Sequence, residues 1–215
     1  MRKNPGRPKA PARAIGQDTQ GDPAAVRERI LETASALFYR EGVRAVGVDL
    51  VVEQAGVAKT SLYRHFGNKD ELIAAYLKRE DEDFWGQWDR IAERHTSDPA
   101  GELDAHLAWI GERVGRPHYR GCPQINVAAE FPDEDHPARF VAAGHKRELR
   151  RRLKDIATRL RAKRPDELAG QLAVLINGAF VSAQMISAAE AVPLLRAAAH
   201  ALVAGGGSRG ISRSA

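Results

Sequence analysis

Apolar residues recur every three or four positions through most of this chain, from Pro23 to about Ala204. In the first such stretch they are Val26, Ile30, Ala34, Leu37 and Phe38. This spacing places apolar side chains on one face of a helix, whereas runs of β-branched residues, which favour strands, are few. The pattern predicts an all-α protein of about nine helices.

The first predicted helices are short and separated by tight turns. One begins at Pro23 and stops at Gly42, and two shorter ones span about 48–54 and 59–65. Gly56 lies between the two short helices, where a glycine can adopt positive φ at little steric cost. This order indicates a helix-turn-helix, in which the second short helix enters the major groove of DNA.

Longer helices follow this segment. Asn68 and Glu71 have the spacing of a capping box and open a helix that should end near residues 96–99. Further helices are predicted around 103–114, over 124–130, from Pro137 to before Pro165, over about 166–189 and over about 193–204. The last two are the most apolar of the chain, so each could bury more than one face.

Composition narrows the class of protein. The chain has 215 residues, of which 43% are hydrophobic, and a formal net charge of +5, which is compatible with a polyanionic partner. A single cysteine, Cys122, excludes an intramolecular disulfide, and no stretch approaches the roughly 18 apolar residues of a membrane span. We therefore expect a cytoplasmic protein without a membrane partner.

Both ends of the chain are polar. Residues 1–22 are rich in Pro, Gly and basic side chains and predict a disordered arm, and residues 206–215 predict a disordered tail. Within the arm, Gly6-Arg7-Pro8 resembles the core of AT-hook peptides, in which the arginine lies in a narrow minor groove. Arg7 is therefore a candidate DNA contact, and a solubilising tail is the alternative.

Three segments of the predicted helix-turn-helix region resemble the TetR family of bacterial regulators. They are Ala55-Gly56-Val57, Leu62-Tyr63-Arg64-His65-Phe66 and Lys69-Asp70-Glu71-Leu72. The resemblance is strong over roughly residues 24–80. Beyond that, the chain is similar to the family in its helical pattern, its length and its two apolar final helices.

The resemblance implies which side chains face DNA. They are Lys59, Thr60, Ser61, Tyr63, Arg64 and His65 of the recognition helix, with Lys69 on a phosphate at the next helix start. Their cationic, hydroxyl and phenol groups suit phosphate and base contacts. Gly47 and Ala58 depart from the family, which usually has capping Thr or Ser there that touches phosphate.

The resemblance also implies an effector pocket among the later helices. Candidate lining residues are Trp85, Trp88, Trp109, Cys122, Gln124, Asn126, Phe180 and Met185. They favour a hydrophobic or aromatic effector. Core packing is the favoured explanation for each aromatic side chain taken singly, and helix capping explains several of the polar ones equally well. A redox role for Cys122 would require a lowered thiol pKa.

Other chemistries have little support. The seven histidines are scattered, and none of them forms a spacing typical of a metal site. No phosphate loop, nucleophile elbow or paired helical carboxylates appear, so we expect neither an enzyme nor a bound cofactor. The basic run over 146–154 is interrupted by Glu148, as on a solvated helix face.

These observations predict a helix-turn-helix domain over 23–68 and a helical effector-binding and dimerisation domain over 69–205. Two-fold DNA sites and the resemblance favour a homodimer through about 166–204, with Leu175 in the interface. The resemblance implies, as the expected function, a transcriptional repressor that a small-molecule effector releases from a palindromic operator in double-stranded DNA. The alternative is an architectural DNA-binding protein without an effector.

Overall fold

The computed structural model describes residues 22–205, which form nine α-helices and no strand. The helices are α1 (Pro23–Glu41), α2 (Val48–Ala55), α3 (Lys59–Phe66), α4 (Lys69–Arg94), α5 (Pro99–Val114), α6 (Pro123–Glu130), α7 (Pro137–Arg159), α8 (Pro165–Ser182) and α9 (Ala188–Gly205). The all-α prediction is confirmed over this range. Arg7, most of the predicted arm and the predicted tail lie outside the described residues.

The local signals at the first turns work as the sequence predicts. Gly56 has φ 63° in the left-handed region and ends α2, and Gly42 has φ 92° at the end of α1. Asn68 caps α4, because its side chain accepts a hydrogen bond from the Glu71 amide at 2.8 Å. Gly47 and Ala58 precede α2 and α3 without a side-chain cap.

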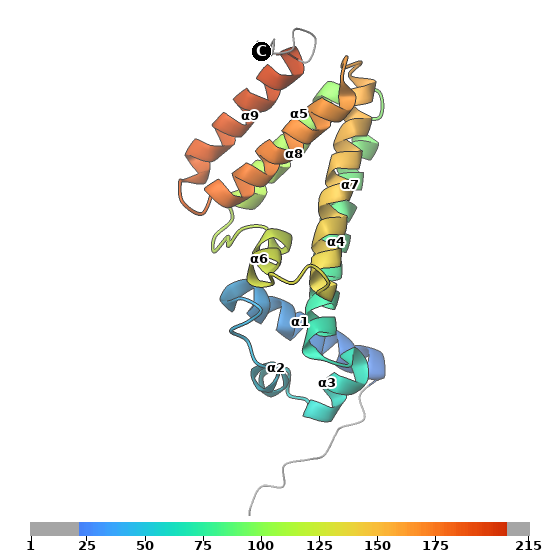
Figure 1. The fold of residues 1–215 in the computed structure, drawn as a ribbon, viewed down its shortest axis with the longest axis vertical. Helices are drawn as coiled ribbons and strands as arrows, with labels where there is room; N and C mark the ends of the chain where they lie inside the picture. The colour runs from blue at the N-terminus through green and yellow to red at the C-terminus, as the bar shows by residue number, and fades with distance from the viewer. Residues whose placement is uncertain (1–21, 206–215) are drawn as a thin grey trace, which may run out of the picture.

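The molecule is elongated, with α1, α2 and α3 at one end and α5, α8 and α9 toward the other (Figure 1). The long helices α4 and α7 pack against each other and run between the two ends. α6 is short, lies between the ends, and packs on α7 and α4. A structural change among α5, α8 and α9 can therefore be transmitted to the first three helices through α4, α6 or α7.

Two hydrophobic clusters form the core. One joins α1, α2 and α3 to the first half of α4, up to Leu77, and also includes Val127 of α6. The other begins at Phe84 and joins the rest of α4 to α5, α7, α8 and α9. α4 thus contributes to both cores, which makes it a rigid connection between them.

The boundary between the last two helices differs from the prediction. α8 ends at Ser182 rather than near residue 189, and α9 begins at Ala188, so Pro193 lies inside it. The reason is local, because the Ser187 hydroxyl accepts from the Glu190 amide and caps α9. The Ser-x-x-Glu spacing of these two residues is a capping-box pattern that outweighs the stop expected from Pro193.

None of the helices within residues 22–205 has the length and apolar character needed to cross a membrane.

Candidate functional site

α3 has one buried face and one exposed face. Leu62 and Phe66 pack into the first core, with Leu62 fully buried. The opposite face exposes Lys59, Thr60, Tyr63 and Arg64 to solvent. The helix therefore presents cationic, hydroxyl and phenol groups together on a free surface at one end of the molecule (Figure 1).

Ser61 departs from its predicted place on that surface. Its side chain is 1% exposed because it lies on the inner side of α3, next to Leu62. Its hydroxyl lies 3.3 Å from Nη2 of Arg64, which donates to it. Ser61 therefore contacts an exposed residue of the predicted set rather than facing outward itself.

Charges around α3 are partly paired. Nζ of Lys59 lies 2.6 Å from a carboxylate oxygen of Asp49, and this hydrogen bond raises the pKa of Lys59. Lys69 is half-buried at the start of α4, and burial lowers its pKa. His65 is also half-buried, and its Nε2 has no hydrogen-bond partner. These residues remain partly accessible next to the exposed face of α3.

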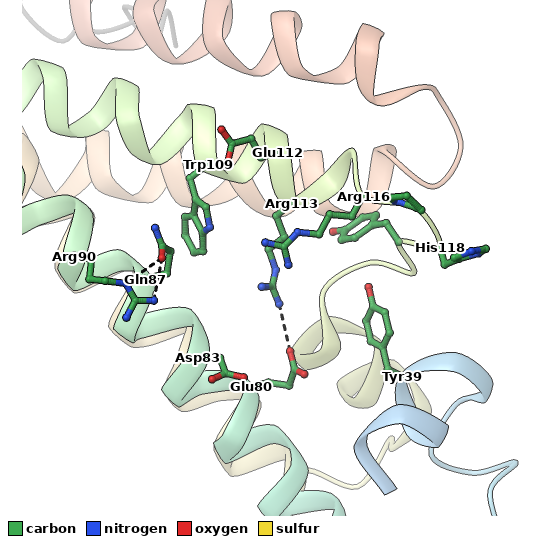
Figure 2. Close-up of a pocket in the computed structure, with 12 residues that line it drawn as sticks. Tyr39, Glu80, Asp83, Gln87, Arg90, Trp109, Glu112, Arg113, Arg116 and His118 are labelled. Carbon is green, nitrogen blue, oxygen red and sulfur yellow. Dashed lines mark hydrogen bonds and ion pairs between the residues drawn. The ribbon is translucent and has the colours of Figure 1, made fainter. Parts of the chain in front are cut away.

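A cleft of about 590 Å³ opens between α4 and α5. Its walls carry Glu80, Asp83, Gln87 and Arg90 from α4, Trp109, Glu112 and Arg113 from α5, Arg116, Pro117, His118 and Tyr119 from the following loop, and Tyr39 from α1. Figure 2 shows Trp109 and Arg113 pointing toward α4, with Tyr39 approaching from α1. The cleft therefore touches the helix-turn-helix end directly.

An ion pair separates this cleft from a smaller inner cavity. Nη2 of Arg113 lies 3.3 Å from a carboxylate oxygen of Glu80 (Figure 2). Both residues line the cleft and the inner cavity. Burial raises the pKa of Glu80. The inner cavity is also lined by Phe84, Cys122, Pro123, Gln124, His145 and Phe180.

Half of the predicted effector residues line the cleft or the inner cavity, and the other half line neither. Trp109 lines the cleft, and Cys122, Gln124 and Phe180 line the inner cavity. The other four lie elsewhere: Trp85, Trp88, Asn126 and Met185.

Each of these four has a different environment. Trp88 is buried and stacks on His106 with ring centroids 3.7 Å apart, while Trp85 packs against His145 under Arg152. The Asn126 amide donates to the backbone oxygen of Arg120 at 2.6 Å. Met185 is 74% exposed in the turn after α8. Helical periodicity places both tryptophans on core-facing sides of α4, and the early end of α8 places Met185 outside the bundle.

Sequence reasoning missed most polar residues of the cleft. On α4, Glu80, Asp83, Gln87 and Arg90 recur at spacings of three and four, so they share one helix face. Such a polar stripe is typical of a solvated helix surface, and only the facing α5 makes it a wall. The sequence offers one signal of a facing wall: Trp109 and Arg113 on the next helix are also four residues apart, so they share one face.

Two side chains join the cleft region to the helix-turn-helix end. Glu130, the last residue of α6, accepts from the backbone amides of Val43 and Arg44 at 3.2 and 2.8 Å. The Tyr39 hydroxyl donates to the Gly121 oxygen at 3.2 Å and accepts from the Arg120 amide at 2.9 Å. The loop that leads into α6 is thereby attached to α1.

Cys122 is buried next to Lys146, whose Nζ lies 3.5 Å from its sulfur and 2.7 Å from Oδ1 of Asn177. Among residues 22–205, no three His, Cys, Asp or Glu side chains are grouped so that they could hold a metal ion.

Comparisons with known proteins agree with this arrangement. Residues 30–76 match the model of the bacterial regulatory proteins of the tetR family. The chain is 32% identical over 137 residues to the HTH-type transcriptional repressor SCO4008 of Streptomyces coelicolor. It is 30% identical over 83 residues to the repressor KstR2 of Mycolicibacterium smegmatis. The first match covers 57% of this chain and 64% of that protein, and the second 39% and 40%.

Solved structures extend the likeness over most of the chain. A TetR-family regulator of Streptomyces coelicolor, SCO4454, superposes with a TM-score of 0.80 at 27% identity, over 86% of this chain and 97% of that one. A structure described as a tetR-transcriptional regulator from Streptomyces avermitilis is 34% identical, with a TM-score of 0.69, over 82% of this chain and 97% of that one. The chain therefore belongs to the TetR family of bacterial transcriptional regulators.

Proposed function

We propose that this protein is a homodimeric transcriptional repressor that binds a palindromic DNA operator and is released from it by a small-molecule effector. The observation that carries the proposal is the amphipathic α3. Its apolar face is fixed in the core, and its exposed face presents Lys59, Thr60, Tyr63 and Arg64. A short helix after a glycine turn with these groups outward suits insertion into a major groove.

The exposed side chains divide into positioning and reading groups. Lys59 and Lys69 suit phosphate contacts, and Lys59 would exchange its Asp49 partner for DNA. Arg64 can donate two hydrogen bonds to a guanine edge, with Ser61 holding its guanidinium from behind. Arg7 remains a candidate for the minor groove.

An apolar stripe on the far end supports the homodimer. Val174, Val181 and Met185 of α8 and the following turn are 72%, 39% and 74% exposed, and Leu194 of α9 is 60% exposed. An exposed apolar surface of this kind is typical of a protein interface. Leu175 is half-buried against the core of its own chain, so Val174 is the better interface candidate.

α6 supports coupling between effector and DNA. Its first residues line the inner cavity, and its last residue, Glu130, holds the loop between α1 and α2. An effector that shifts α6 would therefore move the α3 helices of the dimer away from the spacing of successive major grooves, about 34 to 36 Å.

The test is selection from a random DNA duplex pool by full-length protein at one fixed, near-physiological salt concentration, because salt alone changes apparent specificity. Enrichment of a palindrome is the expected result. Binding of all duplexes with equal affinity would favour the architectural alternative. Absence of any binding by folded protein would contradict the proposal.

A further inference from the structure

Two buried acceptor atoms lack a hydrogen-bond partner at the inner cavity. They are Oε1 of Gln124, on a side chain 2% exposed, and Nε2 of His145, on a side chain 3% exposed. Both residues line this cavity. A buried polar atom without a partner costs free energy, so two at one place indicate a site that a ligand group completes.

The orientation of the Gln124 amide follows from its neighbours. Its nitrogen lies 3.1 Å from the backbone oxygen of Leu77 and 2.6 Å from Oδ1 of Asp81, both of which are acceptors. The two amide hydrogens are therefore used, and the free atom of Gln124 is the carbonyl oxygen.

The tautomer of His145 follows in the same way. Its Nδ1 lies 2.7 Å from Oδ1 of Asp81, so Nδ1 carries the hydrogen. Burial lowers the pKa of His145, which disfavours a second proton on the ring. Its Nε2 therefore exposes a lone pair, and both free atoms need a donor.

Size limits what the inner cavity can hold. Its volume is about 10 Å³, which admits roughly one oxygen-sized group and no ring. The adjoining cleft, at about 590 Å³, has the size of a drug-like ligand site. A ligand that uses both spaces must place its body in the cleft and a single small donor group inside.

The walls favour an aromatic body without net charge. Trp109, Tyr119 and Tyr39 line the cleft, and Phe84 and Phe180 flank the inner cavity. The cleft's three carboxylates, Glu80, Asp83 and Glu112, are balanced by three guanidinium groups, Arg90, Arg113 and Arg116. The charges thus select neither an anion nor a cation.

We infer that the effector is a neutral aromatic molecule with a hydroxyl donor, a phenol in its simplest form. Its ring occupies the cleft, and its hydroxyl parts the Glu80–Arg113 ion pair and donates its single hydrogen to Oε1 of Gln124 or to Nε2 of His145. This inference rests on the proposed function, since it names the effector class of the same site.

The experiment compares β-naphthol with its methyl ether on the full-length dimer. The two probes share the same rings, but the ether cannot donate a hydrogen bond. Isothermal titration calorimetry should give about tenfold tighter binding of the naphthol, the size of one buried hydrogen bond to a neutral acceptor.

Variants assign this preference to the two acceptors. His145→Phe and Gln124→Met each leave Asp81 one partner, and the variant that removes the acceptor of the hydroxyl hydrogen should lower the preference for the naphthol to about threefold or less. His106→Phe is the matched control, because it also replaces a buried histidine stacked on a tryptophan but lines neither space. Thermal unfolding of each variant shows whether it is folded.

The outcomes separate the inference from the proposed function. Equal affinity for the two probes, no binding of either, or a preference unchanged in both variants would each overturn the inference, and equal affinity would assign the inner cavity to a single water. Operator selection is measured on the same protein without probes. If no palindrome is enriched but the naphthol preference is observed, the repressor proposal is contradicted and the inference about the ligand site stands.

Discussion

At the scale of single residues, Arg64 is the side chain of α3 best prepared to read a base. It is exposed on the free face, and the buried Ser61 hydroxyl limits its motion. We expect Arg64→Ala to weaken operator binding by about 1–3 kcal/mol and to relax the preference at one base pair. Fluorescence anisotropy with the selected operator and with single-base variants measures both effects.

The control for this substitution is Arg94→Ala. Arg94 is also exposed but ends α4, a helix of 26 residues, so it lies about 38 Å along that helix from its start near α3. It should leave operator affinity unchanged. An equal loss in the two variants would mean that Arg64 contributes only to overall charge.

His106 makes stability depend on pH. It is fully buried, and its pKa is lowered to about 3, mainly by burial and further by nearby cationic side chains. The unfolded chain, with a histidine pKa of 6.5, therefore binds more protons between these values, so stability is lost as the pH falls from about 6.5 toward 3. The loss should be on the order of a few kcal/mol.

Urea unfolding at about pH 7 and about pH 4.5 checks this expectation. Wild-type protein should lose more stability between the two conditions than His106→Phe, which has no group to protonate there. Carboxylates and His145 contribute to both proteins and cancel in the comparison. Identical losses in the two proteins would show that His106 is protonated in the folded state as well.

At the scale of elements, α6 connects the inner cavity to the loop between α1 and α2. Glu130 holds the amides of Val43 and Arg44, and Val43 is fully buried. In Glu130→Ala these amides lose their acceptor, so we expect their hydrogen exchange to accelerate by at least about tenfold.

The matched control is Glu134→Ala, an exposed carboxylate in the loop after α6. It should leave exchange at Val43 and Arg44 unchanged. If Glu130→Ala also leaves their exchange unchanged, this loop is fixed by packing alone, and α6 does not transmit a change through Glu130.

Elements with two agreeing local signals were predictable from the sequence. The turn at Gly56 combines a left-handed glycine with apolar positions on both sides, and the start of α4 combines Asn68 with Glu71. The boundary between α8 and α9 differs from the prediction because Pro193 is typical of a helix start, whereas the cap at Ser187 starts the helix about one and a half turns earlier.

The cleft could be predicted only in part, because local sequence does not show which helices pack together. Large aromatic side chains are visible in the sequence, but whether one faces a cavity or the core depends on which helices pack together. Trp109 and Trp88 have similar sequence surroundings, yet Trp109 faces the cleft and Trp88 faces His106. The polar wall of α4 is recognisable only once α5 lies opposite.

At the scale of the whole molecule, the proposed repressor requires two copies of α3 at a fixed separation. The exposed apolar stripe on α8 and α9 is the surface that can set this separation, and Val174 is its most exposed residue on α8. Val174→Asp should therefore yield monomers in multi-angle light scattering, because a carboxylate would be buried without a partner at the interface. Operator affinity should fall with it, while each monomer keeps its fold.

Phe140→Asp is the matched control, because it also replaces an exposed apolar residue with a carboxylate. Phe140 is 59% exposed, but it lies near the start of α7 and not on α8 or α9. If Val174→Asp yields monomers and Phe140→Asp remains a dimer, the two recognition helices are joined through α8 and α9. The reverse result would place α7 in the interface, and the geometry of two recognition helices on one operator would then have to be derived from that face.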